Sequence, residues 1–369
     1  YAGWATKLAG ATHEVSLPGK FLSYTRREPV GVVGQIIPWN QPLIMAAWKI
    51  APALACGNSV VLKPAEDTPL SALRLAELIQ EAEVPDGVVN VVTGFGETAG
   101  AHLAAHPDVD KVAFTGSTEV GKIIARTAAE TNLKRVSLEL GGKSPNIVFA
   151  DANLESAIAG AFFGIFLNQG QICYAGSRLF VQDKIYDQAL EGLSNTVKQA
   201  RVGPGIDPVT EIGPLVNEKQ MERVLGYITI GNQEGARLVA GGGRPADLLR
   251  GNFVAPTIFA DVDGKMRIAQ EEIFGPVVAA IPFRDEDDLI AKANDTVYGL
   301  GAGVWTNDVR RAHRVAHALR AGTVFVNCYH ILDAATPWGG FRQSGWGREL
   351  GPYGLDLYTE IKNIVVDIA

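Results

Sequence analysis

The sequence predicts an α/β fold with a doubly wound, largely parallel sheet, because strand-like and helix-like segments alternate along it, and its length predicts more than one domain. Between residue 30 and about residue 140, short apolar runs rich in β-branched residues alternate with segments whose apolar residues recur at helical spacing. This alternation indicates crossover connections, which place neighbouring strands in parallel. The length of 369 residues exceeds what one small core requires, so we expect two or three domains.

The elements of the first half follow from local patterns. Asp67 ahead of Pro69 is typical of a capped helix start, and apolar residues from Leu75 to Ala82 continue at helical spacing. Pro-Asp-Gly at 85–87 indicates a turn before the next strand. The predicted order is a strand at 59–62, a helix at 67–82, a strand at 88–92, a glycine loop at 94–100 that opens a short helix, a strand at 110–114, a helix at 117–130 and a strand at 135–139.

The second half repeats this style with different loops. The apolar run 157–167 is shorter than the roughly 20 residues that cross a bilayer, so we interpret it as part of a buried helix. Residues 361–368 are mostly apolar and β-branched, which indicates an edge strand open to pairing with another chain. The predicted order is a helix at 153–168, a strand at 178–181, a helix at 186–201, a Gly/Pro-rich surface passage at 203–214, a helix at 218–235 and the strand at 361–368.

Charge and composition narrow the function classes. A net charge of −7 argues against a nucleic-acid partner, and we expect the basic cluster at 310–314 to be the solvated face of a helix. Three cysteines without a CxxC pair predict neither a disulfide framework nor a metal site, which favours a reducing compartment. Without a secretory leader or a membrane-spanning run, we predict a cytoplasmic protein with no metal and no membrane partner.

Two glycine loops are candidates for phosphate binding. Residues 93–100 approach the GxGxxG pattern but carry three residues between their second and third glycines. The loop 114–121 fits better, because it follows a predicted strand and opens a helix whose free N–H groups suit a pyrophosphate. A Ser-capped helix after a glycine turn gives the same pattern, so both interpretations stay open from the spacing alone.

Glu66 follows the strand that ends near Lys63, in the region where doubly wound sheets bind ligands. A carboxylate there accepts hydrogen bonds from both ribose hydroxyls of NAD and repels the 2′-phosphate of NADP. Glu66 therefore favours NAD. The alternative is a surface Lys63–Glu66 pair at a helix entry.

Cys173 is the candidate nucleophile. It lies among polar and glycine residues after an apolar helix, whereas Cys56 and Cys328 lie in apolar settings and are expected to be buried and inert. A thiolate adds readily to a carbonyl carbon when a base is near. Glu139, at the end of a strand beside a double glycine, is the candidate base, and the Asn40 amide is a candidate donor to an oxyanion.

A series of motifs then resembles the aldehyde dehydrogenase superfamily, in order and over nearly the whole chain. The motifs are Pro-Trp-Asn at 38–40, Lys-Pro-Ala-Glu at 63–66, Phe-Thr-Gly-Ser at 114–117, Leu-Glu-Leu-Gly-Gly-Lys-Ser-Pro at 138–145, Gly-Gln-Ile-Cys at 170–173, Glu-Glu-Ile-Phe-Gly-Pro-Val at 271–277, Asn-Asp-Thr-Val-Tyr-Gly-Leu at 294–300, Pro-Trp-Gly-Gly at 337–340 and Gly-Arg-Glu-Leu-Gly at 347–351. So many ordered motifs make coincidence very improbable.

The resemblance implies an NAD-dependent, non-acylating enzyme that oxidises an aldehyde to a carboxylic acid. Cys173 is then the nucleophile that forms a thiohemiacetal and a thioester, and Glu139 activates the hydrolytic water. Asn40 and the backbone N–H of Cys173 form the oxyanion hole, and Glu349 lies on the proton exit path. The cofactor-binding residues that it implies are Ile36, Trp39, Lys63, Glu66, Gly96, Phe114, Gly116, Ser117, Leu140, Gln220, Glu272 and Phe274.

The resemblance also implies a domain division. A Rossmann-like NAD-binding domain takes residues 30–141 with 344–357, and an α/β catalytic domain takes 142–343. A small β oligomerisation element takes 11–29 with 358–369, so we expect a homodimer or a homotetramer. Family members carry a further stretch ahead of the position of Tyr1, and we expect this sequence to lack that segment.

The substrate tunnel that motif positions imply is largely apolar. Its residues are Gln41, Met45, Trp48, Leu167, Ile172, Tyr174, His330, Leu332 and Trp338. This lining predicts a hydrophobic or aryl aldehyde, with a betaine-type aldehyde held by cation–π contacts ranked second. Gln41 departs from the aromatic residue that many family members carry there. Two other functions stay open, a non-catalytic oligomeric homologue and a cofactor-free thiol esterase.

Overall fold

The computed structural model describes residues 1–248 and 250–369, and the chain divides into two compact units. The first unit contains Tyr1–Glu139, Asp333–Trp338 and Gly347–Ala369, and the second contains Leu140–Leu332 and Gly339–Trp346. Each unit has helices and a sheet with parallel strands, which confirms the predicted α/β fold class. The division into cofactor, catalytic and oligomerisation parts stays a prediction.

The first unit contains the following elements. Its strands are β1 (Thr12–His13), β2 (Phe21–Pro29), β3 (Val32–Ile36), β4 (Ser59–Lys63), β5 (Val89–Val91), β6 (Lys111–Thr115), β7 (Arg135–Glu139) and β16 (Thr359–Asp367). Its helices are α1 (Pro42–Ala55), α2 (Leu70–Glu81), α3 (Ala101–Ala105), α4 (Thr118–Glu130) and α11 (Tyr353–Asp356), with short helical turns at Ala2–Trp4 and Gly96–Gly100.

The parallel strands of the first unit run in the order β7-β6-β3-β4-β5. The chain passes from β3 to β4 on one side and later returns to place β6 on the other side of β3. This reversal makes the carboxyl ends of β3 and β6 a topological switch point, which is where doubly wound sheets bind ligands. α1 contacts α2 and α3 contacts α4, so right-handed crossovers place the two pairs on opposite faces.

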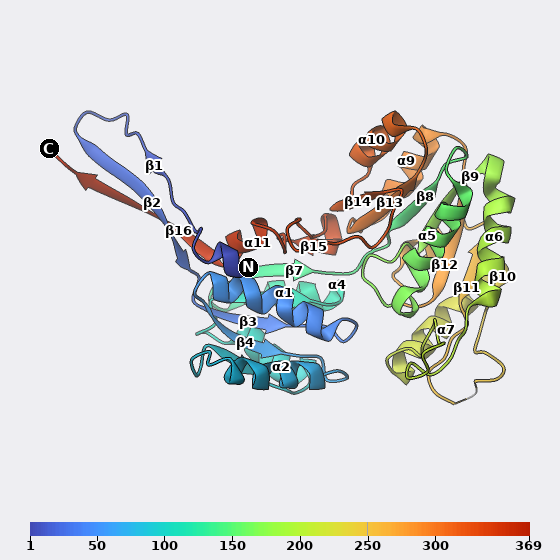
Figure 1. Ribbon diagram of the computed structural model, residues 1–369, viewed down its shortest axis with the longest axis horizontal. Coiled ribbons are helices and arrows are strands. Elements are labelled where there is room, and N and C mark those ends of the chain that lie inside the picture. The colour runs from blue at the N-terminus through green and yellow to red at the C-terminus, as the bar shows by residue number, and fades with distance from the viewer. Residues whose placement is uncertain (249) are drawn as a thin grey trace. The chain divides into compact units, whose positions relative to one another are not determined.

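A second, antiparallel sheet joins the two ends of the first unit. β2 pairs with β1 and along its whole length with β16, from Pro29 opposite Thr359 to Phe21 opposite Asp367. Figure 1 shows β2 in blue and β16 in red side by side. β16 stands at the end of this sheet, so the predicted edge strand is confirmed, and Ile361 is 66% exposed on it.

The second unit contains the following elements. Its strands are β8 (Pro145–Val148), β9 (Arg178–Gln182), β10 (Arg237–Ala240), β11 (Thr257–Ala260), β12 (Val277–Phe283), β13 (Gly301–Trp305), β14 (Thr323–Val326) and β15 (Gly345–Trp346). Its helices are α5 (Leu154–Phe166), α6 (Tyr186–Gln199), α7 (Glu218–Gln233), α8 (Arg267–Gln270), α9 (Glu286–Asn294) and α10 (Val309–Ala318), with helical turns at Leu167–Gly170, Asp183–Ile185 and Arg342–Ser344. The sheet order is β10-β11-β12-β9-β8-β13-β14, with β10 antiparallel to β11 and the other pairs parallel.

Two helix boundaries differ from the predicted ones. α2 begins at Leu70 and not at residue 67, because the residue before Pro69 is disfavoured in the helical conformation. Pro69 is the N-cap residue, and no side chain caps this helix end. The helix predicted to reach residue 168 ends at Phe166, because Asn168 and Gln169 adopt positive φ angles of 50° and 57°. Ser117 caps α4 as its position suggested, accepting a hydrogen bond from the backbone of Val120 at 3.2 Å.

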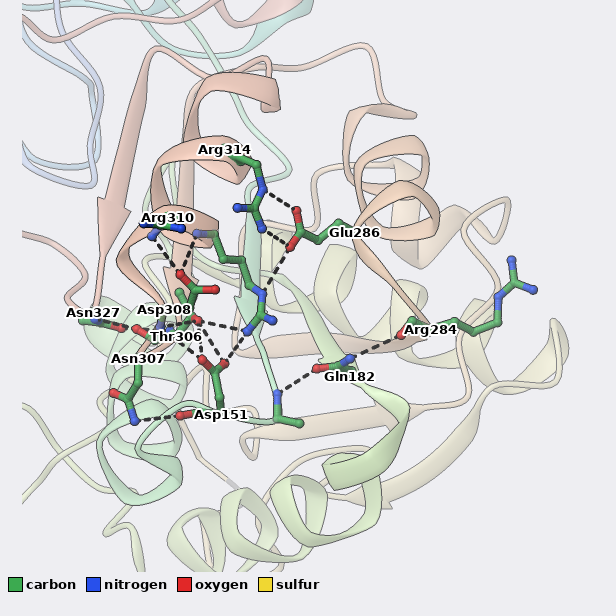
Figure 2. Close-up of polar contacts among 12 residues, drawn as sticks. Asp151, Gln182, Arg284, Glu286, Thr306, Asn307, Asp308, Arg310, Arg314 and Asn327 are labelled. Atoms are coloured by element: carbon green, nitrogen blue, oxygen red, sulfur yellow. Dashed lines mark hydrogen bonds and ion pairs between the residues drawn. The ribbon is translucent and has the colours of Figure 1, made fainter.

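The basic cluster at 310–314 lies on α10 and is more than a solvated face. Arg311 binds Asp151 at 2.8 Å and Glu286 at 3.2 Å, and Arg314 binds Glu286 at 2.7 Å (Figure 2). The charges of Arg311 and Arg314 are therefore paired within the unit.

Within residues 1–248 and 250–369, the structure has no helix of the length and apolar character that a membrane span requires.

Candidate active site

The carboxyl edge of the first unit's parallel sheet gathers several of the predicted cofactor residues. Ile36 lies opposite Lys63 on one side and opposite Phe114 on the other, so three adjacent strands end in register. Gly116 follows directly, and a Cβ there would lie 2.4 Å from the Phe114 ring. Because the ring leaves no room for a side chain at residue 116, glycine is required there. Without a side chain at this residue, the backbone at the N-terminus of α4 stays open to an anion.

Glu66 is held at this edge by hydrogen bonds to its carboxylate. Lys63, itself buried, donates from Nζ to Oε2 of Glu66 at 2.9 Å, and the backbone N–H of Gly96 also donates to the carboxylate. Burial raises the pKa of Glu66, but these hydrogen bonds outweigh it, so the pKa lies below its ordinary value. The carboxylate is therefore ionised and ties the glycine loop to the end of β4.

Glu139 ends β7 as a buried carboxylate that is 5% exposed. Burial, reinforced by the negative charge of Glu349, raises its pKa well above the ordinary value. The positive charges of Lys49 and Arg348 and a hydrogen bond from Trp338 lower it. Oε2 of Glu139 has no hydrogen-bond partner among the residues that the structure describes. A raised pKa and an available acceptor atom suit a general base.

Lys49 is a buried residue of this region that the sequence patterns did not single out. It lies on α1, and its Nζ donates to Oε1 of Glu349, which is also buried. The backbones of Trp338 and Glu349 exchange two hydrogen bonds of 2.7 Å, which fixes Glu349 beside the tryptophan. A lone cation in the apolar stretch 42–55 was the available signal, because such a residue needs a buried counter-charge.

The other predicted first-unit residues have varied surroundings. Trp39, Asn40 and Gln41 are partly buried in the loop between β3 and α1, and Asn40 takes part in polar contacts. Met45 is buried in the core of this unit and Trp48 packs against that core. Trp338 is buried against Glu139. A role of these side chains as substrate walls stays a prediction.

In the second unit, Cys173 lies in the loop between α5 and β9. Asn168, Gln169 and Gly170 all have positive φ angles, so the chain turns sharply before the cysteine. Oε1 of Gln171 accepts a hydrogen bond from the backbone of Val216 at 3.0 Å, which ties down this loop. Cys173 is partly exposed, as a nucleophile must be.

The two other thiols differ from each other. Cys56 is buried, as predicted, and burial raises the pKa of its thiol to about 11. Cys328 is partly exposed, so the expectation that it is buried is wrong. It follows β14 in a loop, and apolar neighbours in sequence do not by themselves bury a loop residue.

Glu272 lies on the backbone of the double glycine. Its Oε1 accepts a hydrogen bond from the N–H of Gly142 at 2.9 Å, and burial raises its pKa to about 7. Gln220 donates to the carbonyls of Ile273 and Phe274 at 3.2 and 2.7 Å, which braces the turn after Glu272. The side-chain nitrogen of Gln220 is thus engaged within the protein, and a direct ribose contact stays a prediction.

Aromatic side chains cluster beside the Cys173 loop. The ring of His330 meets those of Tyr174 and Tyr329 at 4.9 Å and that of Phe163 at 5.3 Å, all edge-on. Burial lowers the pKa of His330 to about 4, so the imidazole is neutral at physiological pH. The ring contact of 4.9 Å brings together two predicted substrate residues, Tyr174 and His330.

The remaining predicted second-unit residues are distributed as follows. Ile172 is buried, Leu332 is partly buried and Leu167 is 38% exposed. Leu140 is buried, and its N–H donates to the carbonyl of Ser344 at 3.0 Å. In the described part of the chain, no group of three or more His, Cys, Asp or Glu side chains is arranged to hold a metal ion.

Lys143, next to the double glycine, is a second buried cation that the sequence patterns missed. It is 2% exposed, and burial lowers its pKa to about 7, against the opposing charge of Glu272. Its Nζ has no hydrogen-bond partner in ranges 1–248 and 250–369. Its place in a glycine-rich motif between two strands was the signal that pointed to a buried site.

Comparisons with known proteins show which family the chain resembles. The model of the aldehyde dehydrogenase family matches residues 1–364. Human mitochondrial aldehyde dehydrogenase is 55% identical over 368 residues, which are 100% of this chain and 70% of that protein. The solved NAD+ complex of a Bacillus cereus aldehyde dehydrogenase is 55% identical, with a TM-score of 0.97, covering 100% of this chain and 74% of that chain. A betaine aldehyde dehydrogenase of Staphylococcus aureus, also solved with NAD+, is 44% identical, with a TM-score of 0.98 and the same coverage.

The chain therefore belongs to the aldehyde dehydrogenase family. The family resemblance and the enzyme class predicted from the motifs are confirmed.

Proposed function

We propose that the protein oxidises aldehydes to carboxylic acids with NAD+ through a covalent intermediate on Cys173. The observation that carries the proposal is the buried carboxylate of Glu139, with its raised pKa and unoccupied Oε2, in the motif that the family uses for its base. Membership of the family and a 55% identical relative solved with NAD+ support the same function.

The first unit has features that fit a dinucleotide. Three strand ends in register, a glycine before the N-terminus of α4 and the ionised Glu66 offer sites for the base, pyrophosphate and ribose of such a molecule. In the second unit, Glu272 would hold the other ribose, with Phe274 beside the nicotinamide. When bound, NAD+ supplies the acceptor for the hydride that leaves the substrate.

The protein's own residues would carry the remaining chemistry. The thiolate of Cys173 adds to the aldehyde carbon, and the resulting oxyanion accepts hydrogen bonds from the Asn40 amide and the Cys173 backbone N–H. One such donor contributes roughly 10²–10³ in rate. After oxidation, Glu139 takes a proton from water, the hydroxide attacks the thioester carbon, and the thiolate leaves as the acid is released. Glu349 and Lys49 would pass the proton away from Glu139.

For the substrate, we propose a hydrophobic or aryl aldehyde. The contacts among Tyr174, Tyr329 and His330, with His330 neutral, support an apolar pocket wall that lacks a formal charge. A betaine-type aldehyde is the second candidate, because aromatic faces also attract a quaternary ammonium group. The likeness to the Staphylococcus aureus enzyme supports this candidate.

We further propose a cytoplasmic homodimer or homotetramer. β16 stands at the edge of its sheet and carries exposed apolar side chains, among them Ile361 and Val365. An open apolar edge is a surface that a second copy of the chain can cover. Sedimentation of the purified protein tests the oligomeric state.

The test of the function is NADH absorbance with a panel of aldehydes and both cofactors. Phenylacetaldehyde and hexanal should give NADH at higher kcat/KM than betaine aldehyde, and NAD+ should be preferred to NADP+. A clear preference for betaine aldehyde would reverse the substrate ranking. Aryl ester cleavage without NADH from any aldehyde would favour a thiol esterase, and failure to bind NAD+ at all would favour a non-catalytic homologue.

A further inference from the structure

The double glycine Gly141–Gly142 contacts two residues to which the proposed function assigns different ligands. Glu272 is assigned to the cofactor and Cys173 to the aldehyde. On one side is the carboxylate of Glu272, predicted to hold the cofactor. A Cβ on Gly141 would lie 2.2 Å from Oε2 of Glu272 and 2.7 Å from its carboxyl carbon. The N–H of Gly142 donates to the other oxygen, Oε1, at 2.9 Å. Both carboxylate oxygens of Glu272 therefore lie close to the Gly141–Gly142 backbone.

On the other side is the backbone of the predicted nucleophile. A Cβ on Gly142 would lie 2.4 Å from the carbonyl oxygen of Cys173 and 3.2 Å from Cβ of Leu300. The nitrogen and the α-carbon of this one residue thus contact the Glu272 carboxylate and the Cys173 carbonyl, respectively.

Space, and not backbone conformation, explains why glycine stands at both positions. Neither Gly141 nor Gly142 is among the glycines with positive φ, so a left-handed backbone is not the reason for glycine there. What excludes a methyl group is the carboxylate at one residue and the carbonyl at the other. Contacts below 3.0 Å require a neighbour to move, and the neighbours here are Glu272 and Cys173.

We propose that Gly141 and Gly142 are positioning residues that fix the Glu272 carboxylate and the Cys173 loop against a common piece of backbone. This inference rests on the proposed function, because it assigns Glu272 to the cofactor and Cys173 to the aldehyde. Gly141 acts on the cofactor side alone. Gly142 acts on both, so it sets the spacing between the residue that holds the nicotinamide ribose and the sulfur that attacks the carbonyl.

The position of Glu272 is restrained from other directions as well. Arg223 donates from Nη2 to the backbone carbonyl of Glu272 at 2.6 Å, which holds the main chain. The buried charge of Lys143 attracts its carboxylate. A methyl group at residue 141 therefore cannot be accommodated by a free swing of the Glu272 side chain without loss of the Gly142 hydrogen bond.

The experiment compares Gly141→Ala and Gly142→Ala with a matched control, Gly226→Ala. Gly226 lies exposed on α7 in the same unit, and a Cβ there meets nothing within 4 Å. Three quantities are measured for each variant: the Kd for NAD+ by calorimetry, the cofactor-free hydrolysis of p-nitrophenyl acetate, which reports on Cys173, and kcat and KM for NADH formation.

Gly141→Ala should weaken NAD+ binding at least tenfold and raise the KM for NAD+, with ester hydrolysis within twofold of the parent. Gly142→Ala should lower both NAD+ affinity and ester hydrolysis at least tenfold, and Gly226→Ala should change none of the three. Unchanged NAD+ affinity in Gly141→Ala, or an equal loss of ester hydrolysis in that variant, would overturn the proposal.

A second background separates positioning from a general loss of folding. Glu272→Ala removes the carboxylate, so adding Gly141→Ala should change its NAD+ affinity and its melting temperature little. A further large loss in the double variant would overturn the proposal even if Gly141→Ala alone fails to fold. Failure of the proposed function has a different signature, because the parent itself would then give no NADH with any aldehyde.

Discussion

Lys49 donates to Oε1 of Glu349 in the interior of the first unit, where the side chains are 0% and 3% exposed. The two charges act on Glu139 in opposite directions. Glu349 raises the pKa of Glu139, and Lys49 lowers it. The two charges therefore stabilise each other and modify the pKa of the predicted base, which burial raises.

Replacing Lys49 by Met should strongly destabilise the protein. The variant leaves the Glu349 carboxylate buried without its counter-charge, and breaking a buried pair in this way costs about 3–5 kcal/mol. Urea denaturation followed by tryptophan fluorescence measures the free energy of unfolding. The double variant Lys49→Met/Glu349→Gln, in which neither charge remains, should recover much of the loss. A single variant within about 1 kcal/mol of the parent would contradict this account.

The pH dependence of thioester hydrolysis should follow the charges beside Glu139. Because the pKa of Glu139 is raised, its basic form appears only as the pH rises well past the ordinary range of a carboxyl group. Glu349→Gln removes a negative charge and should move the midpoint of the steady-state rate to lower pH. Lys49→Met removes a positive charge and should move it to higher pH. Midpoints that shift in the same direction would argue against Glu139 as the titrating base.

NAD+ affinity should rise with pH through about 7, the pKa to which burial raises Glu272. The ionised carboxylate accepts hydrogen bonds from ribose hydroxyls, so its deprotonation favours binding. The Gly142 N–H, Lys143 and Arg223 act on this group and lower its pKa. Lys143→Met should therefore move the transition to higher pH, and Glu272→Gln should remove it. The measurement is the Kd for NAD+ by calorimetry at pH values below and above about 7. A pH-independent affinity in the parent would refute the prediction.

Asp151 should matter for stability and not for catalysis. Its carboxylate accepts hydrogen bonds from the Thr306 hydroxyl at 2.9 Å, the Asp308 N–H at 3.1 Å and Arg311 at 2.8 Å (Figure 2). Asp151→Ala leaves these donors without their acceptor and should lower the free energy of unfolding by about 1–3 kcal/mol. Glu191→Ala is the control, because Glu191 is exposed in the middle of α6, and it should cost under about 0.5 kcal/mol. A changed KM for aldehyde in Asp151→Ala would show that the network reaches the site.

The sequence predicted most of the elements because their patterns are local. The predicted bounds of α2 and α7 are within a few residues of the observed ones, and Ser117 marked the start of α4 correctly. The end of α5 was missed, because the left-handed conformations of Asn168 and Gln169 are not encoded by an apolar pattern. The exposure of Cys328 depends on where its loop lies in the fold, which neighbouring residue types do not reveal.

The candidate site residues were predicted from sequence motifs. The motifs identify these residues but not the residues that they contact in the fold. Glu139 and Glu272 were both singled out. Their surroundings, Lys49 for one and the Gly141–Gly142 backbone for the other, come from segments far apart in sequence or from main-chain atoms. Sequence patterns describe side-chain types along the chain, so contacts of this kind could be identified only once the structure was known.

The most direct test of the central claim is mass analysis of Cys173 in the Glu139→Gln variant after rapid mixing with NAD+ and phenylacetaldehyde. We expect a burst of NADH, slow turnover afterwards, and an acyl group on the peptide that contains Cys173, and Cys328→Ala should leave the adduct unchanged. Sustained NADH formation without any acyl group on Cys173, or an acyl group on another cysteine in its place, would contradict it.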